Sequence, residues 1–398
     1  MRSGGAASEI QLLDGHFYVR DPHRHFQWMR EHAPVYWDAI GGVWGVTLHE
    51  DIMTISKDPE TFCSRFSSRP DQPPFPSMIN IDDPDHKRRR NLVNKGFSVR
   101  RVQDHEPKIR EICDQLIDRV APKGECDFVR DIAAPLPMMV IGDLLGVEPA
   151  DHDKLLRWSE EFLLATSATA SPEVAQGAMR AFEEYAEYSR RVVADRHKHP
   201  RNDLMSVLTH AEIDGERLSD DEILQEGLLI LVGGDETTRH VISGGMEQLI
   251  RHPAQRRTLI DAPATIPTAV EEMLRWVTPI QNMNRTATCT LELRGQTIHE
   301  GDKVLLLYPS GNRDERVFDR PFEFDATRQP NNHVAFGGYG AHFCLGASLA
   351  RLELRVMFET LLRRLPDLEL VNEEPLPLRP SNFIVGIESM PVSFAPRG

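Results

Sequence analysis

The sequence predicts a mainly α-helical fold with a smaller β-rich part, built as one domain over residues 1–398. The first observation is a set of long segments whose apolar residues recur with helical spacing, at 104–121, 136–146, 151–167, 171–199, 203–211 and 223–252. The second is the gathering of strand-like residues near 35–46, 284–307 and 376–395. The third is that no Pro/Gly/Ser-rich linker interrupts the 398 residues, of which 40% are apolar.

The bulk composition excludes several classes of protein. The net charge of −15 makes nucleic acid an unfavourable partner. The five cysteines are an odd number without paired metal-site spacing, which argues against a disulfide framework or a zinc site. No window approaches the ~18 apolar residues of a membrane span, and the N-terminus lacks an apolar signal core. We therefore expect a soluble, cytoplasmic protein without a membrane span.

The N-terminal part predicts short elements followed by a long irregular loop. A helix near Pro22–His32 stops before Pro34, and Gly41-Gly42 joins two strand-like runs into a hairpin. A further helix is expected over Glu50–Lys57. The segment from Ser64 to Pro84 contains four prolines between 70 and 76, which exclude a continuous helix or a central strand. Such long irregular segments are usually functional lids or binding loops.

A basic helix is expected directly after this loop, over Asp85–Gly96. Its residues His86 and Arg90 are four positions apart and therefore share one face. Most charge runs of this kind are solvated faces. We expect Lys87, Arg88 and Arg89 to face outward, where they would offer an acidic partner protein a docking surface.

The helix-forming run from Ile223 to His252 carries a costly interruption at residues 233–238, Gly-Gly-Asp-Glu-Thr-Thr. Each mid-helix glycine costs about 1 kcal/mol relative to alanine, and threonines can bond back to the preceding turn. Glu236 and Thr237 place an acid beside an alcohol, a pair suited to relaying protons. The alternative is a helix crossing that the glycines ease, with exposed acids.

Residues 336–346 read Phe-Gly-Gly-Tyr-Gly-Ala-His-Phe-Cys-Leu-Gly, and a strongly helical run follows over Ala347–Leu365. Glycines let the backbone approach a flat partner closely. A helix N-terminus behind a cysteine favours its thiolate, the form that ligates metal. A buried structural thiol or a phosphate loop is the alternative, but the Lys-Ser/Thr pair of phosphate loops is absent. The pattern indicates an axial thiolate ligand for haem iron at Cys344.

Between these two motifs, Glu272 and Arg275 are three positions apart on an expected helix and can pair. An isolated surface pair contributes only about 0–1 kcal/mol. After Pro279 the pattern changes to strands, expected over Asn284–Ala287, Thr290–Arg294, Gln296–Ile298 and Val304–Leu307.

These residues resemble the cytochrome P450 superfamily along essentially the whole chain. The loop at 336–346 is similar to its haem-binding loop, Phe-Gly-x-Gly-x-His/Arg-x-Cys-x-Gly, and residues 233–238 to its oxygen-activating helix. One departure is that Phe336 precedes Cys344 by eight residues, where seven are usual, because the loop holds an extra glycine; some actinobacterial members share it. The implied fold has a long central helix over the haem.

The resemblance implies a role for each matching residue. Cys344 would ligate the iron, and Glu236 and Thr237 would deliver protons. The other haem contacts implied are His86, Arg90, Arg285, His342, Phe336, Gly338 and Gly346. The implied structural ion pairs join Glu272, Arg275 and Arg328. The expected substrate-facing residues are Met78, Ile79, Leu228, Leu231, Val232, Gly233, Val277, Ile280, Met283 and Ile384.

The implied activity is that of a haem-thiolate monooxygenase with haem b, which inserts one atom of dioxygen into a C–H bond. Electrons from NAD(P)H would arrive through a ferredoxin reductase and a ferredoxin. The stretches 124–131, 234–240 and 378–383 are similar to actinobacterial sterol side-chain hydroxylases, which implies terminal hydroxylation of cholesterol or cholestenone. Another apolar substrate (a fatty acid, terpene or macrolide), a peroxide-driven enzyme and a non-catalytic haem or lipid-binding module are the alternatives.

Overall fold

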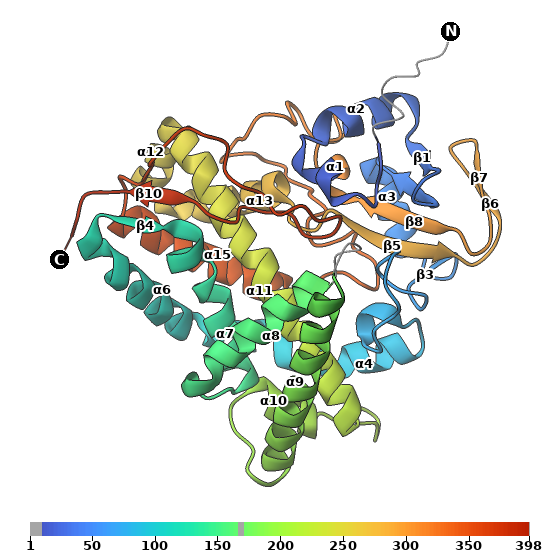
Figure 1. Cartoon of the computed structure of the whole chain (residues 1–398), viewed down its shortest axis with the longest axis horizontal. Coiled ribbons are helices and arrows are strands. Elements are labelled where there is room, and N and C mark those ends of the chain that lie inside the picture. Colours follow the sequence, from blue (N-terminus) through green and yellow to red (C-terminus); the bar gives the residue numbers. More distant parts are fainter. Residues whose placement is uncertain (1–9, 166–170, 398) are drawn as a thin grey trace. The chain divides into compact units, whose positions relative to one another are not determined.

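A computed structural model of the chain describes residues 10–165 and 171–397 (Figure 1). The chain forms two compact units, each assembled from several segments. Unit 1 comprises Met1–Phe75, Ser243–Cys344 and Glu374–Glu388. Unit 2 comprises Pro76–Ile242, Leu345–Glu373 and Ser389–Gly398. The expectation of a single domain over 1–398 stays a prediction.

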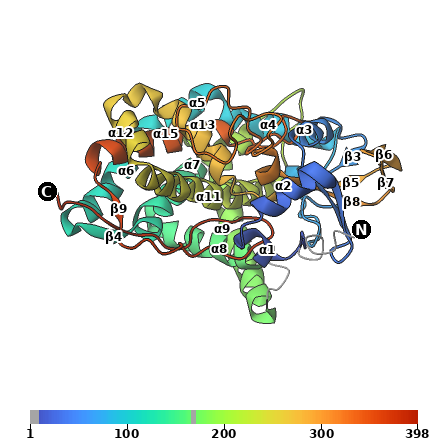
Figure 2. The same cartoon turned by 90° about the horizontal axis from the view of Figure 1, so that it is seen from above.

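Unit 1 is built on a five-stranded mixed sheet of order β1-β2-β8-β5-β3. Its strands are β1 (Val35–Asp38), β2 (Val43–Val46), β3 (Phe62–Cys63), β5 (Asn282–Ala287) and β8 (Lys303–Leu307). Only the β2–β8 pair within this sheet is parallel. The small hairpin of β6 (Leu291–Leu293) and β7 (Gln296–Ile298) extends beyond β5 and β8 in both views (Figures 1 and 2). The predicted hairpin at 35–46 and the predicted strands at 284–307 are confirmed.

Among its described residues, unit 1 also contains six further α-helices besides the end of α11 (Asp220–Arg251). They are α1 (Gly15–Val19), α2 (His23–His32), α3 (His49–Lys57), α12 (Pro253–Asp261), α13 (Ile266–Val277) and α14 (Tyr308–Gly311). Buried residues of β2, β8 and α3, among them Val46, Leu306 and Ile52, form one core cluster. The predicted helices at 22–32 and 50–57 are confirmed.

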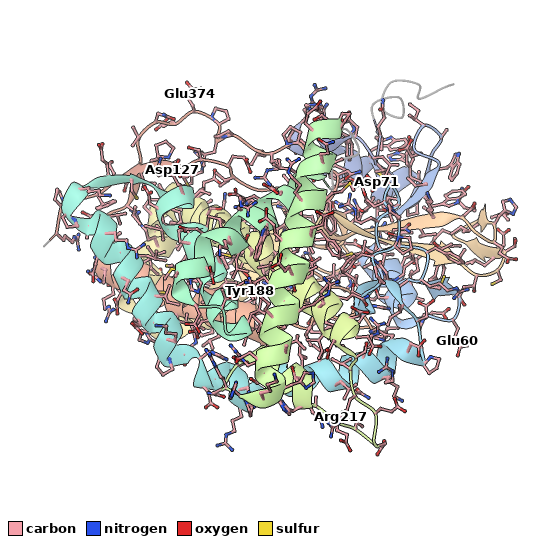
Figure 3. All side chains as sticks on the ribbon, turned by 60° about the horizontal axis from the view of Figure 1, so that its bottom comes forward. Glu60, Asp71, Asp127, Tyr188, Arg217 and Glu374 are labelled. Atoms are coloured by element: carbon pink, nitrogen blue, oxygen red, sulfur yellow. The ribbon has the colours of Figure 1, made fainter. Side chains whose placement is uncertain are left out.

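Unit 2 is mainly helical. Its helices are α4 (Asp85–Asn94), α5 (Val99–Asp104), α6 (Glu106–Val120), α7 (Pro135–Leu145), α8 (His152–Ala165), α9 (Pro172–Lys198), α10 (Leu204–His210) and α15 (Ala347–Arg364). The ring of Trp158 on α8 lies 5.9 Å from that of Tyr185 and 5.7 Å from that of Tyr188, both on α9. Figure 3 labels Tyr188. Residues 166–170, which include the end of the helix predicted over 151–167, lie outside the described residues.

The β-rich part predicted near residues 376–395 contains one short strand and isolated bridges. A small antiparallel sheet in unit 2 has the order β4 (Glu125–Asp127), β10 (Pro391–Ser393) and β9 (Glu369–Leu370). Of these, β9 lies before the expected 376–395 region. Inside that region, residues 378 and 387 form only an isolated bridge, because prolines interrupt the pattern.

The helix α11 (Asp220–Arg251) is 32 residues long, and the division between the units falls within it, after Ile242. It matches the helix predicted over 223–252. Among the described residues, no helix is both long enough and apolar enough to cross a membrane.

Candidate functional site

The cysteine loop of unit 1 packs so closely on α3 that two of its residues must be glycine. A Cβ added to Gly340 would lie 1.6 Å from the carbonyl oxygen of Ser56. A Cβ added to Gly338 would lie 2.4 Å from the Ser56 hydroxyl oxygen. The Cys344 N–H donates to the carbonyl of Phe336 at 3.0 Å and closes the loop. The glycines therefore fix the loop against α3.

The extra residue of this loop is accommodated by left-handed backbone. Gly337 has φ +95° and Tyr339 has φ +57°. The Tyr339 ring stacks on Phe343, with centroids 4.9 Å apart and planes at 18°. The Phe336 ring lies edge-on to Phe343 at 6.3 Å. The longer loop thus keeps its ends joined, although the sequence left the role of this glycine open.

Of the two exposed cysteines, Cys289 and Cys344, only Cys344 lies in the glycine-rich loop. Cys63 and Cys113 are buried, whereas Cys344 is exposed at the end of its loop. Burial raises the pKa of the Cys113 thiol, which makes that thiol inert. A Cβ added to Gly346 would meet nothing within 4 Å. An exposed cysteine on a fixed loop and a glycine beside open space fit a flat metal-containing cofactor.

An accessible stripe follows one face of α11 in unit 2. Gln225, Leu229, Gly233 and Thr237 are spaced by four residues, so each side chain lies about 40° around the helix from the next and the four form a slanting stripe. All four are at least partly exposed, although the residues between them are mostly buried. The stripe therefore borders open space within an otherwise packed helix.

The two glycines of α11 have different surroundings. A Cβ added to Gly233 would meet nothing within 4 Å. A Cβ added to Gly234 would lie 2.5 Å from Cδ1 of Ile141 on α7. Gly233 thus keeps the stripe open, and Gly234 allows helix packing. The helix crossing that the sequence offered as the alternative is thus present at Gly234, but the acids beside it, Asp235 and Glu236, are buried and not exposed.

The acid and the alcohol of α11 are held by different partners. Thr237 donates its hydroxyl to the Gly233 carbonyl at 2.9 Å, the bond to the preceding turn that the sequence predicts. The buried Glu236 carboxylate lies 2.6 Å from Nη2 of Arg239 and 3.2 Å from Nε2 of His240. Adjacent helix positions are about 100° apart, so Glu236 lies off the stripe that carries Thr237. Sequence reasoning missed Arg239 and His240, although i+3 and i+4 spacing pointed to both.

Asp235 is a further buried acid on α11. It accepts a hydrogen bond from the Ser159 hydroxyl of α8 at 2.9 Å. Burial, and secondly the Glu236 charge, raise the pKa of Asp235 to about 7. Burial, with a contribution from the Asp235 charge, also raises the pKa of Glu353 on α15 well above its usual range. The packed side of α11 therefore holds acids that burial keeps protonated near neutral pH.

The prediction that three basic residues of α4 face outward is correct for Lys87 and wrong for Arg88 and Arg89. His86 is buried, and burial lowers its pKa, while its Nδ1 lies 3.3 Å from Asp83. Lys87 is exposed as predicted. Arg88 and Arg89 do not face outward, however, because both pair with Glu222 of α11. Their charges are thereby compensated, and the docking surface expected here loses two of its three charges.

In unit 1, the strand β5 and the C-terminal segment bring several predicted residues together. Ile280 forms a bridge with Ile384, and Met283 packs against the sheet core. Arg285 is buried on β5 and donates to the carbonyl of Asn284 at 2.8 Å.

Val277 and His342 complete the predicted residues of unit 1. Val277 approaches α11, since a Cβ on Gly244 would lie 2.8 Å from its Cγ2. His342 is partly exposed in the cysteine loop.

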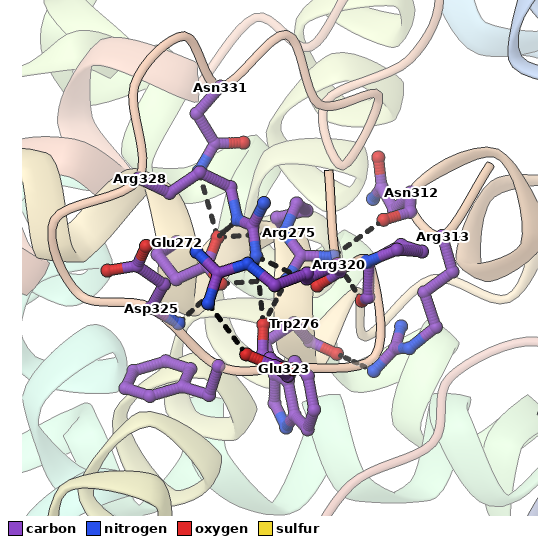
Figure 4. A network of polar contacts seen from close by, with 12 residues as sticks. Glu272, Arg275, Trp276, Asn312, Arg313, Arg320, Glu323, Asp325, Arg328 and Asn331 are labelled. Atoms are coloured by element: carbon purple, nitrogen blue, oxygen red, sulfur yellow. Dashed lines mark hydrogen bonds and ion pairs between the residues drawn. The ribbon is translucent and has the colours of Figure 1, made fainter. Parts of the chain in front are cut away.

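The predicted ion pairs form a buried network in unit 1 (Figure 4). The Glu272 carboxylate accepts from Nε and Nη2 of Arg275, both at 2.7 Å, and from Nε of Arg328 at 3.0 Å. It also accepts from the Asp325 N–H at 2.9 Å and the Asn331 amide at 3.1 Å. Glu272 and Arg275 are both fully buried. The surface pair that is the usual outcome of this motif is thus excluded.

Two of the residues expected to face the substrate lie elsewhere. Leu231 is fully buried, and Leu228 is 7% exposed. Leu228 precedes Thr237 by nine residues, about two and a half turns, and therefore projects to the opposite side of α11. Leu229 takes this place on the stripe. Its i+4 spacing to Gly233 and Thr237 is the signal that would have identified it.

The remaining predicted residues of unit 2 fall into two groups. Met78 is buried and Ile79 is partly buried in the short helix Met78–Asn80. Val232 is partly exposed beside the stripe, and Arg90 is partly exposed on α4.

Comparisons with known proteins agree on one family. The sequence model of the family Cytochrome P450 matches residues 265–393. A Steroid C26-monooxygenase of Mycobacterium tuberculosis is 50% identical over 392 residues, covering 98% of each chain. A Methyl-branched lipid omega-hydroxylase of Mycobacterium bovis is 39% identical, covering 93% of this chain and 90% of the relative.

Solved structures give the same result for the fold. CYP109E1 from Bacillus megaterium in complex with testosterone matches with a TM-score of 0.87 and 32% identity, covering 94% of this chain and 99% of that one. Cytochrome P450 CYP109Q5 from Chondromyces apiculatus matches with a TM-score of 0.89 and 33% identity, covering 98% of both chains. The mainly α fold and the resemblance that the sequence motifs indicate are thereby confirmed, and the chain belongs to the cytochrome P450 family.

Proposed function

We propose that the chain hydroxylates the terminal methyl carbon of a sterol side chain of the cholesterol or cholestenone type. The observation that carries this proposal is the 50% identity to a Steroid C26-monooxygenase over nearly the whole length of both proteins. A solved relative that binds testosterone gives independent support for a steroid-sized apolar ligand.

As a cytochrome P450, the chain is a monooxygenase that binds haem through a cysteine thiolate. A ferredoxin reductase and a ferredoxin bring electrons from NAD(P)H. When bound, the haem supplies the iron at which dioxygen is activated. Two electrons and two protons are consumed: one oxygen atom enters a C–H bond as a hydroxyl group, and the other leaves as water.

We assign the thiolate to Cys344, because it is exposed on a loop that Gly338 and Gly340 fix against α3. Positively charged or hydrogen-bonding side chains would hold the two haem propionates, a recognition that suits Arg and His. The residues proposed for this are His86, Arg90, Arg285 and His342. We further propose Phe336 and Gly346 as contacts of the haem ring.

Thr237 and Glu236 are proposed to move protons. The Thr237 hydroxyl lies on the accessible stripe and can exchange its bond to the Gly233 carbonyl for one to a bound group. The Glu236 carboxylate is buried against Arg239 and His240, so it would exchange protons through His240. The Thr237 hydroxyl on the stripe and the buried Glu236 carboxylate behind it together support an ordered supply of protons to the bound group.

The substrate contacts proposed in unit 2 are Met78, Ile79, Leu229, Val232 and Gly233. Those proposed in unit 1 are Val277, Ile280, Met283 and Ile384. Apolar side chains predominate in both sets, which favours a lipid-like substrate.

The test is a binding screen with the purified haem protein, read by the shift of the haem iron from low to high spin. Cholestenone and cholesterol are compared with a methyl-branched fatty acid, a macrolide and a short terpene. We expect the sterols to produce the tightest shift and mass spectrometry to place the hydroxyl group on the terminal methyl carbon. Absence of a sterol shift, alongside a shift with a macrolide or terpene, would refute the sterol proposal.

A methyl-branched lipid is the second candidate substrate, because a relative at 39% identity is named for that activity. Tighter binding and faster terminal hydroxylation of the branched fatty acid would favour it. Product formation with hydrogen peroxide alone, and none with ferredoxin, would identify the peroxide-driven alternative. A cytoplasmic location stays a prediction.

A further inference from the structure

A short segment at residues 76–80, here called the roof segment, is fixed in unit 2 by a buried acid and a base. Oε1 of Glu226 on α11 accepts the Met78 N–H at 2.9 Å. Nη1 of Arg89 on α4 donates to the Pro76 carbonyl at 3.1 Å and lies 3.2 Å from the same Glu226 oxygen. The pair therefore holds the roof segment by one backbone donor and one backbone acceptor.

The environment of this pair strengthens its hydrogen bonds. The Glu226 side chain is fully buried, and that of Arg89 is 15% exposed. Burial raises the pKa of Glu226 to about 7, although Arg89 and the Met78 N–H both act to lower it. Arg89 is anchored further by Gln225 at 3.1 Å and Glu222 at 3.1 Å. Because the pair is shielded from water, a hydrogen bond that a variant leaves unmade is costly.

The position of Glu226 relates the roof segment to the accessible stripe of α11. Glu226 precedes Gly233 by seven residues and Thr237 by eleven, which is about two and three helical turns. All three residues therefore project to the same side of the helix. Gln225, which accepts from Arg89, is the first residue of the stripe. The pair thus places the roof segment at the N-terminal end of the stripe.

We propose that Arg89 and Glu226 are positioning residues that hold the roof segment over this end of the stripe, and so determine how tightly a long apolar substrate is held and which carbon is oxidised. The inference rests on the proposed function in one respect, namely that Met78 and the stripe contact the substrate. A roof segment released from the pair would let the substrate shift along the stripe, and oxidation would then spread from the terminal carbon to neighbouring carbons.

Three variants separate the contacts. Glu226→Ala removes the acceptor of the Met78 N–H, Glu226→Gln keeps an acceptor but removes the charge, and Arg89→Ala removes the Pro76 contact. Arg88→Ala is the matched control, because Arg88 also joins α4 to Glu222, and its hydrogen bonds go to Glu222 and the Arg217 carbonyl, both outside the roof segment. The carbon monoxide spectrum of the reduced protein reports the folded fraction of each variant.

The first measurement is independent of substrate. Amide hydrogen exchange at Met78 should accelerate at least tenfold in Glu226→Ala, change less in Glu226→Gln and stay unchanged in Arg88→Ala. Equal exchange in Glu226→Ala and the wild-type protein would overturn the proposal, whatever the substrate proves to be. If the wild-type protein binds no sterol, the proposed function fails while this measurement still decides the positioning role.

The second measurement uses cholestenone as the probe. We expect its dissociation constant to rise about tenfold in Arg89→Ala and Glu226→Ala and its hydroxylation to spread to neighbouring carbons, with kcat changed less than threefold. Glu226→Gln should lie between these variants and the wild-type protein. Equal effects of Arg89→Ala and Arg88→Ala would show a merely structural role for α4 and refute the inference.

Discussion

The Glu272 network of unit 1 provides a sharp test of how a buried charge supports this fold. The Glu272→Gln substitution keeps the size of the side chain but removes its charge and replaces one oxygen acceptor by an NH₂ donor. Five hydrogen bonds converge on the Glu272 carboxylate, three of them from the guanidinium groups of Arg275 and Arg328. Both guanidinium groups stay buried in the variant, at 0% and 7% side-chain exposure.

The expected loss is large because the partners cannot regain water. Removing one member of a buried ion pair costs about 3–5 kcal/mol, since the remaining charge loses its compensation. Arg275 keeps its bonds to backbone carbonyls, those of Asn312, Pro321 and Glu323. These bonds satisfy donors but supply no negative charge. A loss of about 3–5 kcal/mol is a large part of the ~5–15 kcal/mol of a typical domain.

The assay is urea unfolding of the haem protein, followed by circular dichroism and by the haem absorbance. The matched control is Glu323→Gln. The Glu323 side chain is 61% exposed and pairs with the exposed Arg320, while its backbone carbonyl, which the substitution leaves in place, accepts from Arg275. We expect a much lower unfolding midpoint in Glu272→Gln and an unchanged midpoint in Glu323→Gln. Equal midpoints for the two variants would refute the reasoning.

Three further predictions concern single groups. Cys344→Ser should abolish the red-shifted carbon monoxide complex of the reduced protein, whereas Cys289→Ser, at an exposed cysteine outside the loop, should keep it. Gly233→Ala should raise the free energy of unfolding of the haem-free protein by about 1 kcal/mol, because alanine favours the helix, but it should lower turnover. Gly234→Ala should lower the free energy of unfolding, because the added Cβ would lie against the Ile141 side chain. Burial raises the pKa of Asp235 to about 7. The folded state therefore keeps a proton that the unfolded state releases near pH 3.8. For this reason the contribution of Asp235 to the free energy of unfolding falls as the pH rises from about 4 to 7. Asp235→Asn should flatten that fall by up to about 1.4 kcal/mol per pH unit in urea titrations, and an unchanged slope would contradict the assignment.

The secondary structure was largely predictable because helical and strand periodicities are local properties. The run predicted over Ala347–Leu365 is the helix α15, which ends at Arg364. The hairpin around Gly41-Gly42 follows from turn residues between strand-like runs, and Gly42 has the positive φ, +62°, that such a turn needs. The β-rich part predicted near 376–395 is less regular: β10 pairs with β4 and β9, whereas residues 378 and 387 form an isolated bridge.

The contacts of charged residues could not be predicted in this way. The spacing of α4 places Arg88 and Arg89 in a basic run, and basic runs are usually solvated. The sequence holds no local sign that Glu222 and Glu226, more than 130 residues away, lie beside them. The outward orientation expected for these arginines was therefore wrong for a physical reason: partner charges came from a distant helix.

The substrate-facing residues were predicted from their order along the chain, and the error at Leu228 and Leu231 shows what was missing. Proximity in sequence to Gly233 does not place a side chain on the same face, because each residue turns the helix by about 100°. Counting in steps of four from Thr237 leads to Gly233, Leu229 and Gln225, and the structure leaves all four of these residues at least partly accessible. Helical phase, applied from one functional residue, would have given the right leucine.

The longer cysteine loop shows how an insertion can leave a ligand in place. A bulky residue at positive φ is strained by about 1–2 kcal/mol, and Tyr339 has φ +57°. Its stacked contact with Phe343 offsets a comparable amount, since aromatic pairs contribute about 0.5–1.5 kcal/mol beyond area burial. Because the Cys344 N–H still reaches the Phe336 carbonyl, the added residue lengthens the loop without separating its ends. The insertion therefore changes what the loop presents to solvent, namely the half-exposed Tyr339, while Cys344 stays joined to Phe336.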